Sequence, residues 1–314
     1  MSYTHYRQVD AAADKLYAQG KYDQALALLQ DTCNQFPEYG YNNLSYQAFL
    51  FRTTGQYEKE YEIAETLIRQ GYFFPIEGEH GSLKQKAGFA SLQEESERLK
   101  AEAQAQARME YAVYRPEGYM EGKRYPLFFV LHGDGGNANL EQFPWYWPSE
   151  AVTRLGFVSV YVQSSQVLTY RNFGWLSDPQ IARRDIKNCY DMVTSQFAVD
   201  PDIVIVGGFS GGAITAIDIA LTDALPVRGF VCVSPEIKPA SFTVENVRRA
   251  AQRGVRGVFM EGGEVIPVPD EQEMMQAFQD AGLPCQFYVN PGVGHVIPED
   301  LAEKLRQAVD FITH

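Results

Sequence analysis

The sequence predicts an α/β fold with a mostly parallel sheet, preceded by an all-α unit. From Met109 onward, short apolar runs alternate with stretches of helical apolar spacing, which is typical of a sheet covered by helices on both faces. Before Met109 the apolar spacing is helical and contains an internal repeat. We therefore expect two domains, a helical module at residues 1–108 and an α/β domain at residues 109–314.

Length and composition are those of an ordinary globular protein. With 314 residues and 45% hydrophobic composition, the chain can bury a large core. The net charge of -13 and the pI near 4.9 argue against nucleic acid or an anionic membrane as a partner, because both would repel the chain. The N-terminus has no apolar core of a signal peptide, and no run approaches the ~18 apolar residues of a membrane span. We therefore expect a cytoplasmic protein.

The four cysteines are Cys33, Cys189, Cys232 and Cys285, far apart and without C-x-x-C spacing. This pattern predicts buried thiols, with no disulfide framework and no zinc site.

The first 70 residues contain the internal repeat. Ala13, Leu16, Gly20 and Tyr22 recur 35 positions later as Ala48, Phe51, Gly55 and Tyr57. Each copy predicts a helical hairpin, and together they resemble the tetratricopeptide repeat. In the second copy Glu60 stands where that repeat has a small alanine, so the packing of its second helix does not follow from the resemblance.

A supporting element is expected after the hairpins, because two repeats are fewer than the roughly three that such modules need for stability. Gly71–Gly81 predicts a loop, and Ser82–Arg108 predicts a long amphipathic helix. The module could bind a peptide or a second subunit, cover the mouth of the next domain, or pack as a cap without a ligand.

The α/β part contains seven candidate strands, each a short apolar run. They are Glu110–Tyr114, Leu127–Leu131, Phe157–Val162, Ile203–Val206, Gly229–Val233, Gly257–Met260 and Gln286–Val289. Helices are expected at Gln180–Gln196, Ala213–Leu221, Val244–Gln252, Glu271–Asp280 and Glu299–Ile312.

The segment Gly208-Phe209-Ser210-Gly211-Gly212 carries the most chemistry in the chain. It lies between an apolar strand and an Ala-rich helix, the context that a G-x-S-x-G nucleophile needs. A serine on so sharp a turn is strained, and the glycines two positions away on each side let strand and helix approach. The pattern predicts Ser210 as a nucleophile and the backbone N–H of Gly211 as an oxyanion donor.

A glycine-rich loop, His132-Gly133-Asp134-Gly135-Gly136-Asn137, follows the strand at Leu127–Leu131. Nucleophile-elbow enzymes place their second oxyanion donor in a loop at this position. We assign that donor as the backbone N–H of Asp134.

Three stretches carry a family resemblance: LHGDGGN at 131–137, VDPDIVIVGGFSGGA at 199–213 and GVGHVIPE at 292–299. They resemble the α/β-hydrolase superfamily over residues 109–314. Within it they are similar to the polyhydroxybutyrate depolymerase and feruloyl esterase-like group, and to the phospholipase and carboxylesterase group. The resemblance implies an α/β-hydrolase fold and a triad in the order serine, carboxylate, histidine.

The base is sought among five histidines. Four of them lie in the helical module, a loop, the oxyanion loop and the C-terminus, namely His5, His80, His132 and His314. His295 remains, in a glycine-rich loop after the last strand, where the resemblance places the catalytic histidine.

The acid must lie between Ser210 and His295. The family's usual Gly-x-x-Asp is not matched, because Val265 stands in the aspartate's register after Gly262. Glu264 is one residue earlier and is the residue we favour. The alternatives are Asp270 and Glu236.

Aromatic residues crowd two loops of the α/β part: Phe143, Trp145, Tyr146 and Trp147, and later Tyr170, Phe173 and Trp175. Loops at the carboxyl ends of parallel strands line the binding site, so these rings could form an acyl or aryl pocket. Alternatively, they pack the helical module onto the α/β domain.

The sequence thus predicts a serine hydrolase that cleaves a small-molecule carboxylic ester through an acyl-enzyme, with neither cofactor nor metal. A peptidase or a thioesterase would use the same triad. A further hypothesis is a catalytically impaired scaffold that works through residues 1–108, by binding a protein partner or by self-association.

Overall fold

The computed structural model describes residues 3–75, 84, 86–135, 138–264 and 269–314. The chain divides into two compact units. The first comprises Met1–Ala107 and two short later segments, of which Val167–Asn172 is the longer. The second holds nearly all of the chain after Arg108.

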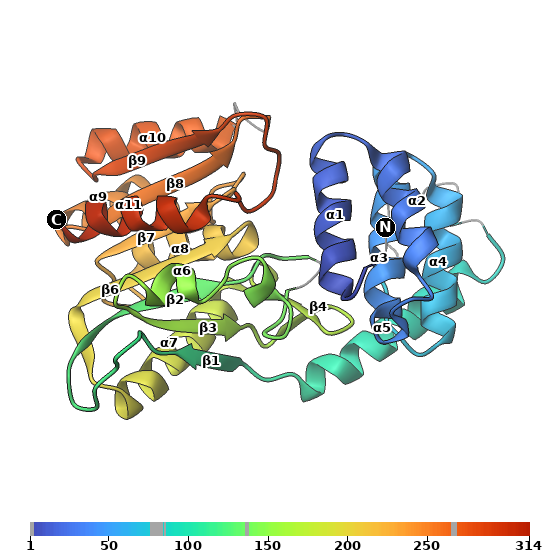
Figure 1. The fold of residues 1–314 in the computed structure, drawn as a ribbon, viewed down its shortest axis with the longest axis horizontal. Helices are drawn as coiled ribbons and strands as arrows, with labels where there is room; N and C mark the ends of the chain where they lie inside the picture. The colour runs from blue at the N-terminus through green and yellow to red at the C-terminus, as the bar shows by residue number, and fades with distance from the viewer. Residues whose placement is uncertain (1–2, 76–83, 85, 136–137, 265–268) are drawn as a thin grey trace. The chain divides into compact units, whose positions relative to one another are not determined.

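The N-terminal part of the first unit is helical (Figure 1). Its α-helices are α1 (Tyr6–Ala18), α2 (Tyr22–Thr32), α3 (Gly40–Thr53), α4 (Tyr57–Arg69) and α5 (Phe89–Gln106). A short 3-10 turn, η1 (Pro37–Tyr39), separates the second and third. The helices α1 with α2 and α3 with α4 pair as hairpins, as the repeat predicts. Along the described ranges, no helix is both long enough and apolar enough to span a bilayer.

Glu60, the residue that departs from the repeat pattern, is buried in the second hairpin. Its Oε1 lies 3.5 Å from Nε of Arg52 on α3. An ion pair therefore takes the place of the small-residue contact between these helices.

The supporting helix is shorter than predicted. It begins at Phe89 instead of Ser82, because Gly88 has a φ of 89° that a helix cannot continue through. Ser96 on this helix donates to the Phe74 carbonyl oxygen at 2.6 Å and accepts from the Phe74 N–H at 3.0 Å. These bonds fasten α5 to the end of the second hairpin. Most of the predicted loop at Gly71–Gly81, with His80, lies outside the described residues.

The second unit contains all seven predicted strands. They are β1 (Glu110–Tyr114), β2 (Tyr125–Leu131), β3 (Val158–Gln163), β6 (Val199–Phe209), β7 (Gly229–Val233), β8 (Arg256–Gly262) and β9 (Cys285–Asn290). They form one sheet in the order β1-β3-β2-β6-β7-β8-β9. Only β1 runs antiparallel to its neighbour, and the remaining pairs are parallel.

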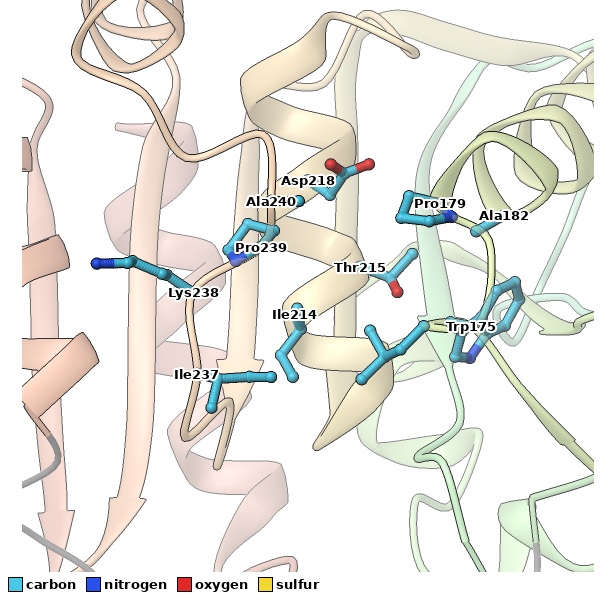
Figure 2. A pocket seen from close by; sticks show the side chains of 11 residues that line it. Trp175, Pro179, Ala182, Ile214, Thr215, Asp218, Ile237, Lys238, Pro239 and Ala240 are labelled. Carbon is cyan, nitrogen blue, oxygen red and sulfur yellow. The ribbon is translucent and has the colours of Figure 1, made fainter.

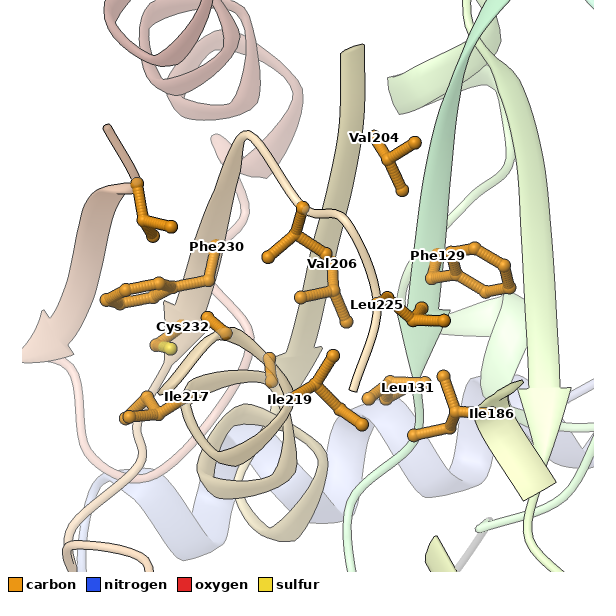
Figure 3. Packing of buried hydrophobic residues seen from close by; sticks show 14 of the residues in the cluster. Phe129, Leu131, Ile186, Val204, Val206, Ile217, Ile219, Leu225, Phe230 and Cys232 are labelled. Carbon is orange, nitrogen blue, oxygen red and sulfur yellow. The ribbon is translucent and has the colours of Figure 1, made fainter. Parts of the chain in front are cut away.

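Helices cover both faces of this sheet. They are α6 (Glu150–Thr153), α7 (Pro179–Gln196), α8 (Gly211–Thr222), α9 (Val244–Gln252), α10 (Pro269–Ala281) and α11 (Leu301–Thr313). Side chains of α7 to α10 pack in the core on one face, and those of α6 and α11 in the core on the other. Figure 3 shows strand residues such as Phe129, Val206 and Phe230 packed against Ile217 and Ile186 of the covering helices. Burial on both faces explains why these strands are continuously apolar instead of alternating.

Two short elements escaped the sequence analysis. The strands β4 (Gln166–Thr169) and β5 (Asn172–Gly174) form a separate two-stranded sheet. Arg171 turns the chain between them with a φ of 57°.

The cysteines are free thiols; Cys189 and Cys232 are buried, and Cys33 and Cys285 are half-buried.

Candidate active site

The predicted strand–turn–helix is present around Ser210. Strand β6 ends at Phe209, α8 begins at Gly211, and Ser210 between them has φ 51° and ψ -118°. For a residue other than glycine this backbone conformation is strained, and such strain is concentrated at functional sites. The Ser210 N–H donates to the Val233 carbonyl oxygen at 2.9 Å, which fixes the turn to the end of β7.

The glycines around Ser210 are required sterically. A Cβ on Gly208 would lie 2.6 Å from the carbonyl carbon of Gly212. A Cβ on Gly212 would lie 2.3 Å from the His132 carbonyl oxygen. The two glycines thus let β6, α8 and the loop after β2 converge on the serine. Because Gly211 is the first residue of α8, its N–H has no partner within the helix.

The loop after β2 runs beside the serine. A Cβ on Gly133 would lie 3.4 Å from Cβ of Ser210. The Asp134 carboxylate accepts the backbone N–H of Trp175, at 2.9 Å from each oxygen, and that of Leu176 at 3.1 Å. Burial raises the pKa of Asp134 to about 6, and these two hydrogen bonds oppose the rise. The carboxylate therefore anchors the peptide whose N–H the sequence assigned as the second donor. Gly136 and Asn137 of the motif lie outside the described residues.

His132 is part of the scaffold of this loop. Burial lowers the pKa of its imidazole to about 4, so the ring is neutral at physiological pH. Its Nε2 accepts the Ser164 N–H at 3.3 Å, which assigns the proton to Nδ1, 2.8 Å from the Gly133 carbonyl oxygen. The Trp175 ring lies 4.8 Å from the imidazole, between centroids. A neutral ring held on both nitrogens serves to fix the loop.

His295 lies in the loop after β9. Its ring centroid is 4.9 Å from that of Phe209, the residue directly before Ser210. The loop is packed on the end of β8, because a Cβ on Gly262 would lie 2.3 Å from the Gly294 carbonyl oxygen. The structure thus brings two predicted site residues, 85 positions apart in the chain, to the same end of the sheet.

The carboxylate at His295 is that of Glu236. Its Oε1 lies 2.8 Å from Nδ1 of His295, within hydrogen-bond distance, although the angle at Nδ1 departs from that of a hydrogen bond. Such contacts are often poorly aligned in enzymes without substrate. The interaction with His295 lowers the pKa of Glu236, against a smaller opposing effect of burial, so Glu236 is ionised. A tight turn after β7 presents it, with a φ of 49° at Ser234 and 51° at Glu236.

Glu264, the acid favoured from the sequence, is placed differently. Its side chain is exposed, and its backbone N–H donates to the Val293 carbonyl oxygen at 3.1 Å. Asp270 accepts the backbone N–H of Lys238 at 3.1 Å. Among the described residues it is Glu236, the third candidate, whose carboxylate reaches His295. Val265, in the family's aspartate register, lies outside the described residues.

A pocket of about 150 Å³ opens beside α8 (Figure 2). It is lined by Trp175, Leu176, Pro179, Ala182, Ile214, Thr215, Asp218, Ile237, Lys238, Pro239 and Ala240. Of the aromatic residues predicted to line a pocket, Trp175 does so.

Other members of that aromatic group lie elsewhere. Phe143 and Trp147 are buried in the core on the α6 and α11 face of the sheet. Tyr170 belongs to the first unit, with its ring 5.0 Å from that of Tyr41 and 4.5 Å from that of Tyr72, between centroids. Apolar character alone did not distinguish core rings from pocket rings.

Sequence reasoning missed two buried carboxyl groups near the site. Glu261, near the end of β8, and Glu271, in the first turn of α10, are 0% and 1% exposed. Burial raises the pKa of both, that of Glu261 to about 10, and each also experiences the negative charge of Glu236. The available signal was a glutamate continuing the apolar run Val258-Phe259-Met260.

Within the described ranges, no group of three or more His, Cys, Asp or Glu side chains could hold a metal ion.

The parallel sheet, the two helical layers and the serine turn define an α/β-hydrolase fold, as the resemblance implied. Residues 177–313 match the phospholipase/carboxylesterase family, a match that begins before α7 and ends within α11. These residues include Ser210, Glu236 and His295. None of the curated protein sequences matches the chain significantly.

Solved structures share the fold at low sequence identity. An uncharacterised protein from Bacillus cereus ATCC 10987 is 21% identical, with a TM-score of 0.52, and the alignment covers 98% of this chain and 99% of that one. Esterase PE8 is 16% identical, with a TM-score of 0.51, over 65% of this chain and 99% of its own. A ferulic acid esterase is 18% identical, with a TM-score of 0.52, over 65% of this chain and 91% of its own. The family match supports ester hydrolysis in general, and the solved structures support the fold.

Proposed function

We propose that the protein is a serine hydrolase that cleaves a carboxylic ester through an acyl-enzyme, with Ser210, His295 and Glu236 as its triad. The observation that carries this proposal is the 2.8 Å contact between Glu236 Oε1 and His295 Nδ1. The same histidine packs on Phe209, one residue before the strained serine. We further propose that residues 109–314 form the catalytic domain and residues 1–108 a separate helical module.

The reaction follows from these positions. Ser210 Oγ attacks the ester carbonyl carbon while Nε2 of His295 takes the hydroxyl proton. The carbonyl oxygen becomes an oxyanion and accepts the N–H groups of Gly211 and Asp134, each contributing about 100- to 1000-fold in rate. His295 then gives its proton to the leaving alcohol. Water repeats the sequence on the acyl-enzyme and releases the acid.

Glu236 acts on the histidine. When the contact aligns in the substrate complex, ionised Glu236 accepts the Nδ1–H of His295 and so presents Nε2 to the serine, and its charge favours the imidazolium that forms during each step. In this proposal it replaces Glu264, whose exposed side chain lies at the solvent. The irregular acid position was the main support for a catalytically impaired scaffold, and Glu236 accounts for it. An ester is favoured over a peptide or thioester because the family match and the named neighbours concern esterases.

The test is hydrolysis of p-nitrophenyl acetate by the full-length chain. Ser210→Ala and His295→Gln should each lower kcat/KM by at least about 1000-fold, because the two residues act as a unit. His314→Gln is the matched control, since that side chain is 81% exposed at the C-terminus, and it should retain wild-type activity. Thermal unfolding verifies that each variant is folded. Wild-type activity in folded Ser210→Ala would refute the proposal.

A further inference from the structure

Three residues that line the pocket beside α8 are connected to residues of the proposed site. Ile214 donates its backbone N–H to the Ser210 carbonyl oxygen at 3.0 Å. Leu176 donates its N–H to the carboxylate of Asp134 in the oxyanion loop, and Ile237 directly follows Glu236 in the chain. Because the lining borders these residues, a group attached to a carbonyl at Ser210 can extend into this pocket.

The polar side chains of the pocket are already satisfied by protein partners. Asp218 accepts Nε and Nη2 of Arg183, each at 2.7 Å, and also the hydroxyl of Ser241. The Thr215 hydroxyl donates to the Gly211 carbonyl oxygen at 2.9 Å. Figure 2 shows the Lys238 side chain directed away from the other lining residues, and its Nζ pairs with Glu273.

The surface that remains for a ligand is apolar. Trp175, Leu176, Ile214 and Ile237 are the large apolar side chains in its lining. Leu176 and Ile237 are 38% and 51% exposed, so large apolar side chains stand open to solvent at the pocket. A charged or strongly polar group would lose its hydration here without gaining a partner, whereas an apolar group would bury these side chains with it.

The size of the pocket limits what it can hold. An apolar cavity of about 150 Å³ accommodates a molecule such as benzene. Along α8, Asp218 lies eight residues beyond Ser210, or about 12 Å at 1.5 Å per residue. At that distance the pocket reaches the ion pair between Asp218 and Arg183. A long acyl chain would have to displace this pair or leave the pocket.

We propose that this pocket binds a compact apolar group of the substrate, with no more than about six carbons or a single aromatic ring. The inference rests on the proposed ester hydrolysis and specifies its substrate class. The group can be carried by the acid or by the alcohol of the ester, because both are attached next to the carbonyl carbon.

Two series of esters test the proposal with the full-length chain. The first is p-nitrophenyl esters with acyl chains of 2, 4, 6, 8 and 12 carbons, and the second is acetates of methyl, butyl, benzyl and dodecyl alcohol. Each additional pair of methylene groups that the pocket buries should raise kcat/KM roughly 10-fold. Beyond about six carbons kcat/KM should fall again. A rise in the first series assigns the pocket to the acyl group, and a rise in the second assigns it to the alcohol.

Variants then connect the preference to the pocket. Ala240→Leu fills the pocket from an exposed position, and Ile237→Ser removes apolar surface at its edge. Each should lower the rate for the preferred ester relative to the shortest one by about 5- to 10-fold. Val244→Ala is the control, because Val244 is 60% exposed and outside the pocket, and it should leave the ratio unchanged.

Labelling with a fluorophosphonate separates the two proposals. If the folded protein is neither labelled at Ser210 nor active on any ester, the proposed function itself fails, and this inference with it. If Ser210 is labelled and acetate is hydrolysed, but both series are flat or favour dodecyl chains, the assignment of the pocket is wrong while the proposed function stands. Ratios that both pocket variants leave unchanged would also overturn the assignment.

Discussion

The proposed triad makes its sharpest prediction at two glutamates. Glu236→Gln removes the negative charge from the contact with His295 while keeping the length of the side chain. Glu264→Gln makes the same chemical change at an exposed position. We expect a large loss of kcat/KM in the first variant and a change of less than about twofold in the second, since surface substitutions away from a site have little effect.

The size of the loss follows from the exposure of the contact. A buried triad aspartate replaced by its amide costs about 10⁴-fold in kcat. Here the Glu236 side chain is 41% exposed and that of His295 is 28% exposed. Solvent screens the charge and can partly replace it, so we expect a smaller loss of about 10²- to 10³-fold, or roughly 3–4 kcal/mol of transition-state stabilisation.

The assay is kcat/KM for p-nitrophenyl butyrate at pH 7.5, with the thermal unfolding of each variant recorded. Because Glu236 acts through His295 and does not touch the substrate, the loss should fall on kcat more than on KM. A 100-fold loss in Glu264→Gln, together with normal activity in Glu236→Gln, would restore the acid that the sequence favoured and refute the triad proposed here.

Three further predictions concern the surroundings of the site. Because the pKa of Glu261 is raised, the folded state keeps a proton that the unfolded state releases above pH ~4.5, so the stability of the fold falls as the pH rises towards 10. Glu261→Gln should therefore raise the urea midpoint at pH 9 more than at pH 5. An equal shift of the midpoint at both pH values would contradict this. Asp134→Asn weakens the anchoring of the oxyanion loop to Trp175, so kcat should fall about 10- to 100-fold with little change in KM. Gly212→Ala places a Cβ 2.3 Å from the His132 carbonyl oxygen, so we expect little folded protein by circular dichroism, and a native melting temperature would contradict the close approach.

The fold could be predicted because its elements are long, apolar and regularly spaced. Continuous apolar runs located the strands, since a parallel sheet is buried on both faces. The ends of β1, β7 and α9 matched the prediction, and most other ends extended by one to three residues. The four-residue β4 and three-residue β5 carry too little periodicity to be distinguished from a loop.

The part of the site that depends on small residues could be predicted from the sequence. Glycines flank Ser210 because a Cβ would collide there, and this requirement is visible in the motif. The position of Glu236 depends on a turn in which Ser234 and Glu236, neither of them glycine, adopt positive φ. No residue type signals such a turn, so the distance between Glu236 and His295 could be learned only from the structure. The sequence also did not separate the core rings of Phe143 and Trp147 from that of Trp175 at the pocket, because all three are equally apolar.

The central claim, that Ser210 is the nucleophile, is tested most directly by peptide mass spectrometry of the protein inactivated with a fluorophosphonate. We predict one adduct per chain on the peptide that contains Ser210, formed in proportion to the loss of ester hydrolysis and absent from folded Ser210→Ala. An active protein that loses its activity with the adduct on another residue, or that remains fully active after Ser210 is labelled, would contradict the account.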